Sequence, residues 1–288
     1  MPTEKLSQHL LEQIVASVRL ALVEDLGGGD LTAPLVPEKQ LANATVIAKD
    51  AAILCGQPWF EQVFRQLDRG IKVDWKMTEG AAVSAGQIIC EVHGNARVIL
   101  TGERSALNFL QTLSATATAT RAFVDAVDGT GATILDTRKT LPGLRAAQKY
   151  AVRCGGAQNH RLGLFDAILI KENHIVAAGG IQSAVEVARK QSDGVLIEVE
   201  IANLEQIDTA LTSGAQRILL DNFSLADLCD AVSIRNEVSP SIGLEASGGI
   251  TLDNVRDIAK TGVDFISVGS LTKDIRATDL SMRFQQID

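Results

Sequence analysis

The sequence lacks long apolar runs. It has 288 residues and is 46% hydrophobic, yet no stretch approaches the roughly 20 apolar residues of a membrane-spanning helix. The first residues, Met1 to Gln8, are polar and lack the apolar core of a signal peptide. We therefore expect a cytoplasmic protein that has no membrane partner.

Cysteine and positive charge are also scarce. The four cysteines (Cys55, Cys90, Cys154 and Cys229) do not show the paired spacing of a zinc site, which favours reduced thiols. Acidic residues number 35 against 27 basic ones, giving a formal net charge of -8. This balance argues against general binding to nucleic acid, although it permits a local basic pocket.

The first part of the chain changes from a helical to a strand-like pattern. Apolar residues at helical spacing predict a helix over residues 6–25. Short strand-like runs follow at 44–48, 51–55, 71–75, 88–92 and 97–100, with a helix at 58–67. A long helical stretch begins at Thr101, and its small residues from Ser114 to Thr120 suit close packing against another helix.

One segment of this region leaves an alternative function open. Residues 79–88 resemble half of the hammerhead of a lipoyl- or biotinyl-carrier domain, and Lys76 lies just before them. No lysine has the hairpin-tip position of a modified lysine, so a small β-rich domain with similar turns is the simpler interpretation.

From Ala132 onward, apolar runs alternate with helical segments. Strands are expected at 132–135, 167–170, 195–199, 217–220, 242–244 and 265–268, and helices around 144–152, 181–190, 204–211, 225–232 and 252–260. This alternation predicts parallel βαβ units, in a doubly wound sheet or an α/β barrel. The strands end in acids, bases and hydroxyls, which favours the barrel.

The polar strand ends fall into a basic and an acidic set. Arginine binds carboxylate or phosphate through its planar fork, so a basic cluster in an acidic protein implies an anionic ligand. Carboxylates beside such a site typically hold sugar hydroxyls or Mg²⁺. The basic set is Arg138, Lys139, His160, Arg161 and Lys171; the acidic set is Glu200 and Asp221, with Glu198 and Glu245 as weaker candidates.

The last two strand ends predict a second anion site. Ser247-Gly248-Gly249-Ile250 precedes a helix expected from Thr251, and Gly269-Ser270 ends the last strand. Backbone N–H groups at a helix start bind anions, and barrels often bind phosphate in these two loops. The residues alone therefore indicate a small-molecule enzyme with one carboxylate-like and one phosphate-like site, without naming its substrates.

Several long motifs, in order, resemble the quinolinate phosphoribosyltransferase family over nearly the whole chain. They span residues 21–32, 102–108, 136–143, 155–156, 159–164, 170–174, 198–200, 220–222 and 245–250. The resemblance implies transfer of phosphoribosyl from 5-phosphoribosyl-1-pyrophosphate to quinolinate with Mg²⁺, releasing nicotinate mononucleotide, pyrophosphate and CO₂. It implies a β-rich N-terminal α/β sandwich (1–112, joined by 273–288) and an open, incomplete α/β barrel (113–272).

The resemblance also implies the roles of single residues. It implies a homodimer whose active sites are shared, with Arg104 coming from the other subunit. Lys139, Lys171, Glu200 and Asp221 would be catalytic, and Glu200 and Asp221 would hold Mg²⁺ directly or through water. Quinolinate would contact Arg104, Thr137, Arg138, His160, Arg161 and Lys171; phosphoribosyl pyrophosphate would contact Lys139, Glu200, Asp221, Ser247, Gly248, Gly249 and Gly269.

Two other enzymes stay open at this stage. Lys171 lies where a class I aldolase places its Schiff-base lysine, and a dense cationic neighbourhood would favour that chemistry. A phosphoribosyltransferase of the same fold that takes nicotinate or another aromatic acid is the nearer alternative. Three arginines suit a dicarboxylate better than a monocarboxylate, so quinolinate leads.

Overall fold

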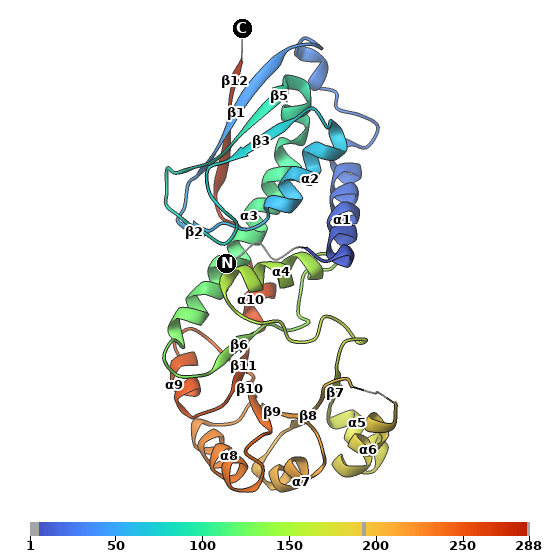
Figure 1. Ribbon diagram of the computed structural model, residues 1–288, viewed down its shortest axis with the longest axis vertical. Helices are drawn as coiled ribbons and strands as arrows, with labels where there is room; N and C mark the ends of the chain where they lie inside the picture. Colours follow the sequence, from blue (N-terminus) through green and yellow to red (C-terminus); the bar gives the residue numbers. More distant parts are fainter. Residues whose placement is uncertain (1–5, 192–193, 287–288) are drawn as a thin grey trace. The chain divides into compact units, whose positions relative to one another are not determined.

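The computed structural model describes residues 6–191 and 194–286 of the chain (Figure 1). It divides into two compact units, the first formed by 1–121, 141–156 and 274–288, the second by 122–140 and 157–273. The domain limits expected from the sequence stay a prediction, and their ends at 1–5 and 287–288 lie outside the described residues. No helix among the described residues is long and apolar enough to cross a membrane.

The first unit is built on a four-stranded antiparallel sheet in the order β12-β1-β5-β3. The C-terminal strand β12 pairs with β1 along seven residues, so the last strand of the chain joins the same sheet as its first strand. Helices α1, α2 and α3 lie beside this sheet (Figure 1). The elements of this unit are α1 (Gln8–Leu26), η1 (Ala33–Leu35), β1 (Leu41–Ala48), β2 (Ala52–Ile53), α2 (Gln57–Leu67), β3 (Lys72–Trp75), β4 (Ala82–Val83), β5 (Ile88–Asn95), α3 (Ala96–Ala126), α4 (Arg145–Gly155) and β12 (Leu280–Gln286).

The core of the first unit follows from the alternation of β1. Ala42, Ala44, Val46 and Ala48 are all buried because every second side chain points to the same face. The aromatic residues of α2 (Trp59, Phe60 and Phe64) join them in one cluster with the buried face of α3.

The sequence-based prediction of a strand over residues 97–100 is wrong, because α3 already begins at Ala96. Arg97 and Val98 donate backbone N–H groups to the Asn95 side chain, which caps the first turn of the helix. The small residues of α3 do pack closely, as expected: a Cβ added at Gly155 of α4 would lie 2.5 Å from the Cβ of Thr120.

The second unit holds six parallel strands in the order β6-β11-β10-β9-β8-β7. Sequential strands are neighbours except at β6 and β7, which stand at opposite ends, so the sheet is a barrel left open between these two. The expected fold class is therefore confirmed. The strands are β6 (Thr133–Leu135), β7 (Ile168–Ile170), β8 (Ile197–Ile201), β9 (Arg217–Asp221), β10 (Gly243–Ser247) and β11 (Phe265–Ser267).

Helices α6 to α9 line the outer side of these strands (Figure 1). The helices of this unit are α5 (Glu172–Ala178), α6 (Ile181–Gln191), η2 (Leu204–Gln206), α7 (Ile207–Thr212), α8 (Leu225–Val238), α9 (Val255–Lys260) and α10 (Ser270–Lys273). The helix expected to begin at Thr251 begins only at Val255 and has six residues. Before it, Asn254 accepts the N–H of Thr251 and donates to the carbonyl of Gly249, forming a turn.

Candidate functional site

The interior of the barrel receives every second side chain of each strand. Glu198 and Glu200 of β8 share one face, as do Arg217, Leu219 and Asp221 of β9. The parallel register sets Asp221 opposite Ser247 of β10. Polar groups from neighbouring strands therefore gather where the strands end, as the sequence pattern predicts.

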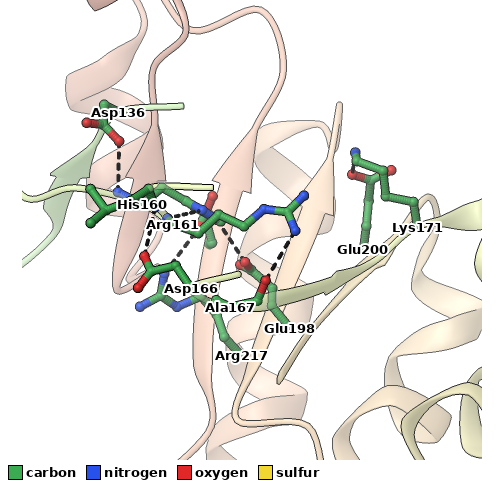
Figure 2. Close-up of polar contacts among 11 residues, drawn as sticks. Asp136, His160, Arg161, Asp166, Ala167, Lys171, Glu198, Glu200 and Arg217 are labelled. Atoms are coloured by element: carbon green, nitrogen blue, oxygen red, sulfur yellow. Dashed lines mark hydrogen bonds and ion pairs between the residues drawn. The ribbon is translucent and has the colours of Figure 1, made fainter. Parts of the chain in front are cut away.

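Asp136 anchors one wall of the site. It directly follows β6, is fully buried, and accepts hydrogen bonds from the Asn159 side chain (2.6 Å) and the His160 backbone (2.8 Å) (Figure 2). A backbone bridge between Leu135 and Gln158 supports the same connection. Asp136 thus fixes the segment that carries His160 and Arg161 at the end of β6.

His160 turns its ring toward two buried carboxylates. Its Nδ1 accepts the backbone N–H of Arg161 (2.7 Å), which leaves the ring proton on Nε2. Nε2 lies 2.8 Å from Glu198 and 3.5 Å from Glu245. The contact with Glu198 is close but poorly aligned, since neither oxygen of Glu198 has a well-formed hydrogen bond. The side chain of His160 is only 8% exposed, so it supports the floor of the site.

Glu198 and Glu245 form a carboxylate pair beneath the site. Both are buried, and Arg217 lies 3.2 Å from Glu245 while stacking on the Phe265 ring at 3.9 Å. Burial raises the pKa of Glu198, and burial together with the charge of Glu198 raises the pKa of Glu245 to about 8. With a pKa of about 8, Glu245 is predominantly protonated at neutral pH despite the cations beside it.

Arg138 and Arg161 form a cationic pair. Arg161 donates to the carbonyl of Ala167 (3.2 Å), and its pKa is lowered by burial and then by the charge of Arg138 (Figure 2). The Nε of Arg138 is buried and has no hydrogen-bond partner among the described residues. Two like charges that act on each other, one of them with an unsatisfied donor, can bind an anion.

Lys171, which directly follows β7, forms an ion pair with Glu200 of the adjoining strand β8 (Figure 2). The Lys171 side chain is 48% exposed and that of Glu200 is 18% exposed. Lys171 caps α5 and donates its backbone N–H to Nδ1 of His174 (3.0 Å). The charge that contacts the Lys171 ammonium is therefore a carboxylate and not a second cation.

Lys139 and Gly269 meet at the other end of the sheet. A Cβ added at Gly269 would lie 3.1 Å from Cδ of Lys139 and 3.6 Å from Oγ1 of Thr137. The backbone of Lys139 is held by Thr137, which accepts its N–H (3.0 Å), and by Thr272, which donates to its carbonyl (2.7 Å). Thr137, Lys139 and Gly269 are therefore neighbours, as a shared site requires.

The glycine loop after β10 is folded against β9. Gly248 and Gly249 have φ values of +99° and +60°, which glycine adopts without strain. Asn222 donates its backbone N–H to the carbonyl of Ser247 (2.8 Å). A Cβ added to Gly248 would lie 2.1 Å from the side-chain oxygen of Asn222. The loop, and not a helix start as expected from the sequence, therefore supplies any backbone donors here.

Two family models match the chain. The N-terminal domain of quinolinate phosphoribosyl transferase matches residues 30–114, and the C-terminal domain matches residues 116–283. The chain belongs to the quinolinate phosphoribosyltransferase family. This result confirms the family expected from the motifs.

Relatives of the family cover the chain almost completely. A human nicotinate-nucleotide pyrophosphorylase (carboxylating) is 40% identical over 94% of this chain and 91% of its own length. The counterpart from Mycobacterium leprae is 41% identical over 92% and 95%. A nicotinate-nucleotide pyrophosphorylase structure from Francisella tularensis has a TM-score of 0.92 at 47% identity, covering 96% of this chain and 97% of that one.

A more distant structure, human nicotinic acid phosphoribosyltransferase, has a TM-score of 0.62 at 11% identity and covers 95% of this chain and 74% of that one. At this level of identity the likeness shows the fold alone. The fold therefore does not separate a monocarboxylate from a dicarboxylate substrate, and the side chains of the site must do so.

Sequence reasoning missed part of the floor of the site. The sequence predicts Arg217 only as the first residue of a strand, although its spacing from Leu219 and Asp221 places it on the interior face. Asp136 appears in the sequence only as the first residue of the motif 136–143. The contact of the two distant glutamates with His160 has no signal in the sequence, because it depends on how the segment after residue 156 folds back.

The residues with predicted roles are not all brought together. The second unit contains all of them except Arg104, which is exposed on α3 in the first unit. The carrier alternative finds no support, because Lys76 lies beside β5 through a backbone bond to Ile89 and its ammonium contacts Asp74 and Glu91.

Proposed function

We propose that this chain is a decarboxylating quinolinate phosphoribosyltransferase. It transfers the phosphoribosyl group of 5-phosphoribosyl-1-pyrophosphate to the ring nitrogen of quinolinate and releases CO₂, giving nicotinate mononucleotide. The observation that supports this most directly is the Arg138–Arg161 pair, in which the buried Nε of Arg138 has no partner among the described residues. Family membership supports the same reaction.

The arginine pair fits the acid substrate. Each guanidinium binds one carboxylate through two parallel hydrogen bonds, so two of them fix a dicarboxylate in position and in orientation. Asp136 and His160 act indirectly, by holding the backbone before Arg161. A monocarboxylate would satisfy one arginine and leave two like charges facing each other without a second anion.

The carboxylates Glu200 and Asp221 fit the sugar and the metal. Both are partly exposed on the interior face of adjacent strands, and carboxylate oxygens are the ligands that Mg²⁺ prefers. We therefore assign Glu200 and Asp221 to Mg²⁺, directly or through water, and to the ribose hydroxyls. The metal would supply charge neutralisation for pyrophosphate. Lys139, beside Gly269, reaches the same phosphates from the opposite end of the sheet.

The same groups stabilise charge during the reaction. As pyrophosphate leaves, positive charge develops at the anomeric carbon, and the carboxylates of Glu200 and Asp221 stabilise it. Lys139 and Lys171 balance the negative charge of the leaving group. The ribosylated ring nitrogen is cationic and stabilises the electron pair that departing CO₂ leaves on the adjacent carbon, and this carbon then takes up a proton from water. The chain contributes orientation and fixed charges, and no covalent intermediate is needed.

We further propose that the enzyme is a homodimer in which Arg104 of the partner subunit completes the quinolinate site. Arg104 is exposed on α3 and so is free to contact another molecule. A third guanidinium would add further hydrogen-bond donors to the quinolinate carboxylates beside Arg138 and Arg161.

The test is a steady-state assay with phosphoribosyl pyrophosphate and Mg²⁺, offering quinolinate and nicotinate separately. We expect mononucleotide to form when quinolinate is the acid offered, and not when nicotinate is. Turnover with nicotinate but not with quinolinate would overturn the assignment of Arg138 and Arg161 to a dicarboxylate. The assignment of the phosphoribosyl pyrophosphate site would stand. Chelation of the metal should stop turnover, and added Mg²⁺ should restore it; full turnover in chelator would refute the assignment of Glu200 and Asp221 to a metal.

A further inference from the structure

We propose that Cys55 and Cys154 form a reversible disulfide, a thiol-modification site in the first unit that is separate from the transferase chemistry. Cys55 follows β2, and Cys154 lies near the end of α4. About 100 residues of chain separate them, yet both belong to the same compact unit. Their sulfur atoms and a carboxylate oxygen of Glu79 all lie within 4.8 Å of one another.

The two cysteines differ in their access to solvent. Cys154 is half-buried and is the more accessible of the two, whereas Cys55 is completely buried. In such a pair the more accessible thiol is oxidised first to a sulfenic acid. The buried thiol then condenses with this sulfenic acid to form the disulfide. Reduced cytosolic proteins use disulfides of this kind transiently rather than as permanent cross-links.

Glu79 is placed to assist the buried thiol. Its carboxylate accepts the backbone N–H groups of Gly56 (2.7 Å) and Gln57 (3.1 Å), and one of its oxygens lies within 4.8 Å of both sulfur atoms. Burial raises the pKa of Glu79 and that of Cys55, so the thiol is protonated at neutral pH and needs a neighbouring base before it can attack. Glu79 is placed to be that base.

The oxidant required is a hydroperoxide. Its O–O bond breaks as Cys154 gains an S–O bond, giving a sulfenic acid and releasing water or an alcohol. The sulfur of Cys55 then attacks the Cys154 sulfur while Glu79 takes the thiol proton. The S–O bond breaks, the leaving hydroxide is protonated to water, and the S–S bond remains. A dithiol reductant restores both thiols by exchange.

The reduced pair requires little rearrangement. A disulfide holds its sulfur atoms about 2.05 Å apart, so sulfurs that already lie within 4.8 Å approach through side-chain rotation and small shifts of α4. Closing a loop of about 100 residues also restricts the unfolded chain, so the oxidised protein should melt at a higher temperature than the reduced one.

The experiment maps disulfides in the intact protein after treatment with hydrogen peroxide. The sample is alkylated in denaturant and digested without reductant, and its peptides are identified by mass spectrometry. We expect a linked peptide pair containing Cys55 and Cys154, the loss of two of the four thiols, and full recovery with dithiothreitol. Absence of the linked pair, or over-oxidation of Cys154 without it, would overturn the proposal.

Variants separate the roles of the groups. Cys229→Ser removes an exposed thiol on α8 and should leave the linked pair unchanged, whereas Cys55→Ser should trap the sulfenic acid on Cys154, detected as a dimedone adduct. Glu79→Gln should slow formation of the linked pair at neutral pH. Linkage at the wild-type rate in Glu79→Gln, or one tightly bound zinc per chain that protects both thiols, would count against the proposal.

Discussion

Arg138 has a buried Nε without a partner among the described residues, and it lies beside the second guanidinium of Arg161. We predict that Arg138→Ala raises KM for quinolinate roughly 10- to 150-fold, because a hydrogen bond to a charged group contributes about 1.5–3 kcal/mol. KM for phosphoribosyl pyrophosphate should change little. Arg189→Ala, an exposed arginine on α6, is the matched control. Unchanged quinolinate affinity in Arg138→Ala would contradict this role.

Glu245 gives a prediction for stability against pH. Its pKa rises from the ordinary value of 4.5 to about 8 on folding, so the folded state holds a proton that the unfolded state has lost. Between these two values stability should fall as pH rises, by at most about 1.4 kcal/mol per pH unit. Glu245→Gln cannot lose this proton. Melting temperatures from pH 5 to 9 should decline more steeply for the wild type, and parallel curves would refute the shift.

At the scale of structural elements, the end of β11 depends on a glycine. A Cβ at Gly269 would press on Cδ of Lys139 at 3.1 Å, a contact that a flexible side chain relieves by moving. We predict that Gly269→Ala lowers kcat/KM for phosphoribosyl pyrophosphate about 10-fold or more while the melting temperature stays near that of the wild type. Gly28→Ala, where the added Cβ meets nothing within 4 Å, is the control. Equal activity in both variants would show that Lys139 does not act on phosphoribosyl pyrophosphate.

The elements also show how far the sequence alone leads. Short continuous apolar runs and polar strand ends predicted all six barrel strands, because a parallel strand buried on both faces leaves a strong local pattern. The strand predicted over residues 97–100 was wrong because a short apolar run is compatible with a strand or a helix. The helix start is set by the Asn95 side chain, whose capping role depends on its conformation. The late start of α9 likewise depends on a side-chain conformation that the sequence does not reveal. The Asn254 side chain forms hydrogen bonds with the backbone of Thr251 and Gly249, and these bonds hold a turn before the helix.

The site was predictable where it lies at strand ends and not where it depends on tertiary contacts. Glu200, Asp221 and Lys171 follow from position in the strand. The contact of His160 with Glu198 does not, because a segment that follows α4 and a strand far from it in sequence create this contact. Arg104 shows a further limit: its role follows only from the family resemblance, and no pattern around it on α3 indicates one.

At the scale of the whole molecule, the proposed dimer makes a prediction about mixed subunits. Arg104→Ala and Glu200→Gln should each be inactive alone, since each removes one half of every shared site. The two variants are unfolded, mixed in equal amounts and refolded together. Half of the resulting dimers then contain one subunit of each kind, and each of these dimers regains one complete site. Turnover should recover to about a quarter of the wild type. Activity no greater than that of the separate variants would place Arg104 outside the partner's site.

The most direct measurement of the central claim is a single turnover with quinolinate labelled in the carboxyl group next to the ring nitrogen. The account predicts one labelled CO₂ for every mononucleotide formed, and an unlabelled product that keeps its other carboxylate. Reaction should require both phosphoribosyl pyrophosphate and Mg²⁺. A labelled mononucleotide, or mononucleotide formed without CO₂, would contradict the claim that this chain couples ribosylation of quinolinate to its decarboxylation.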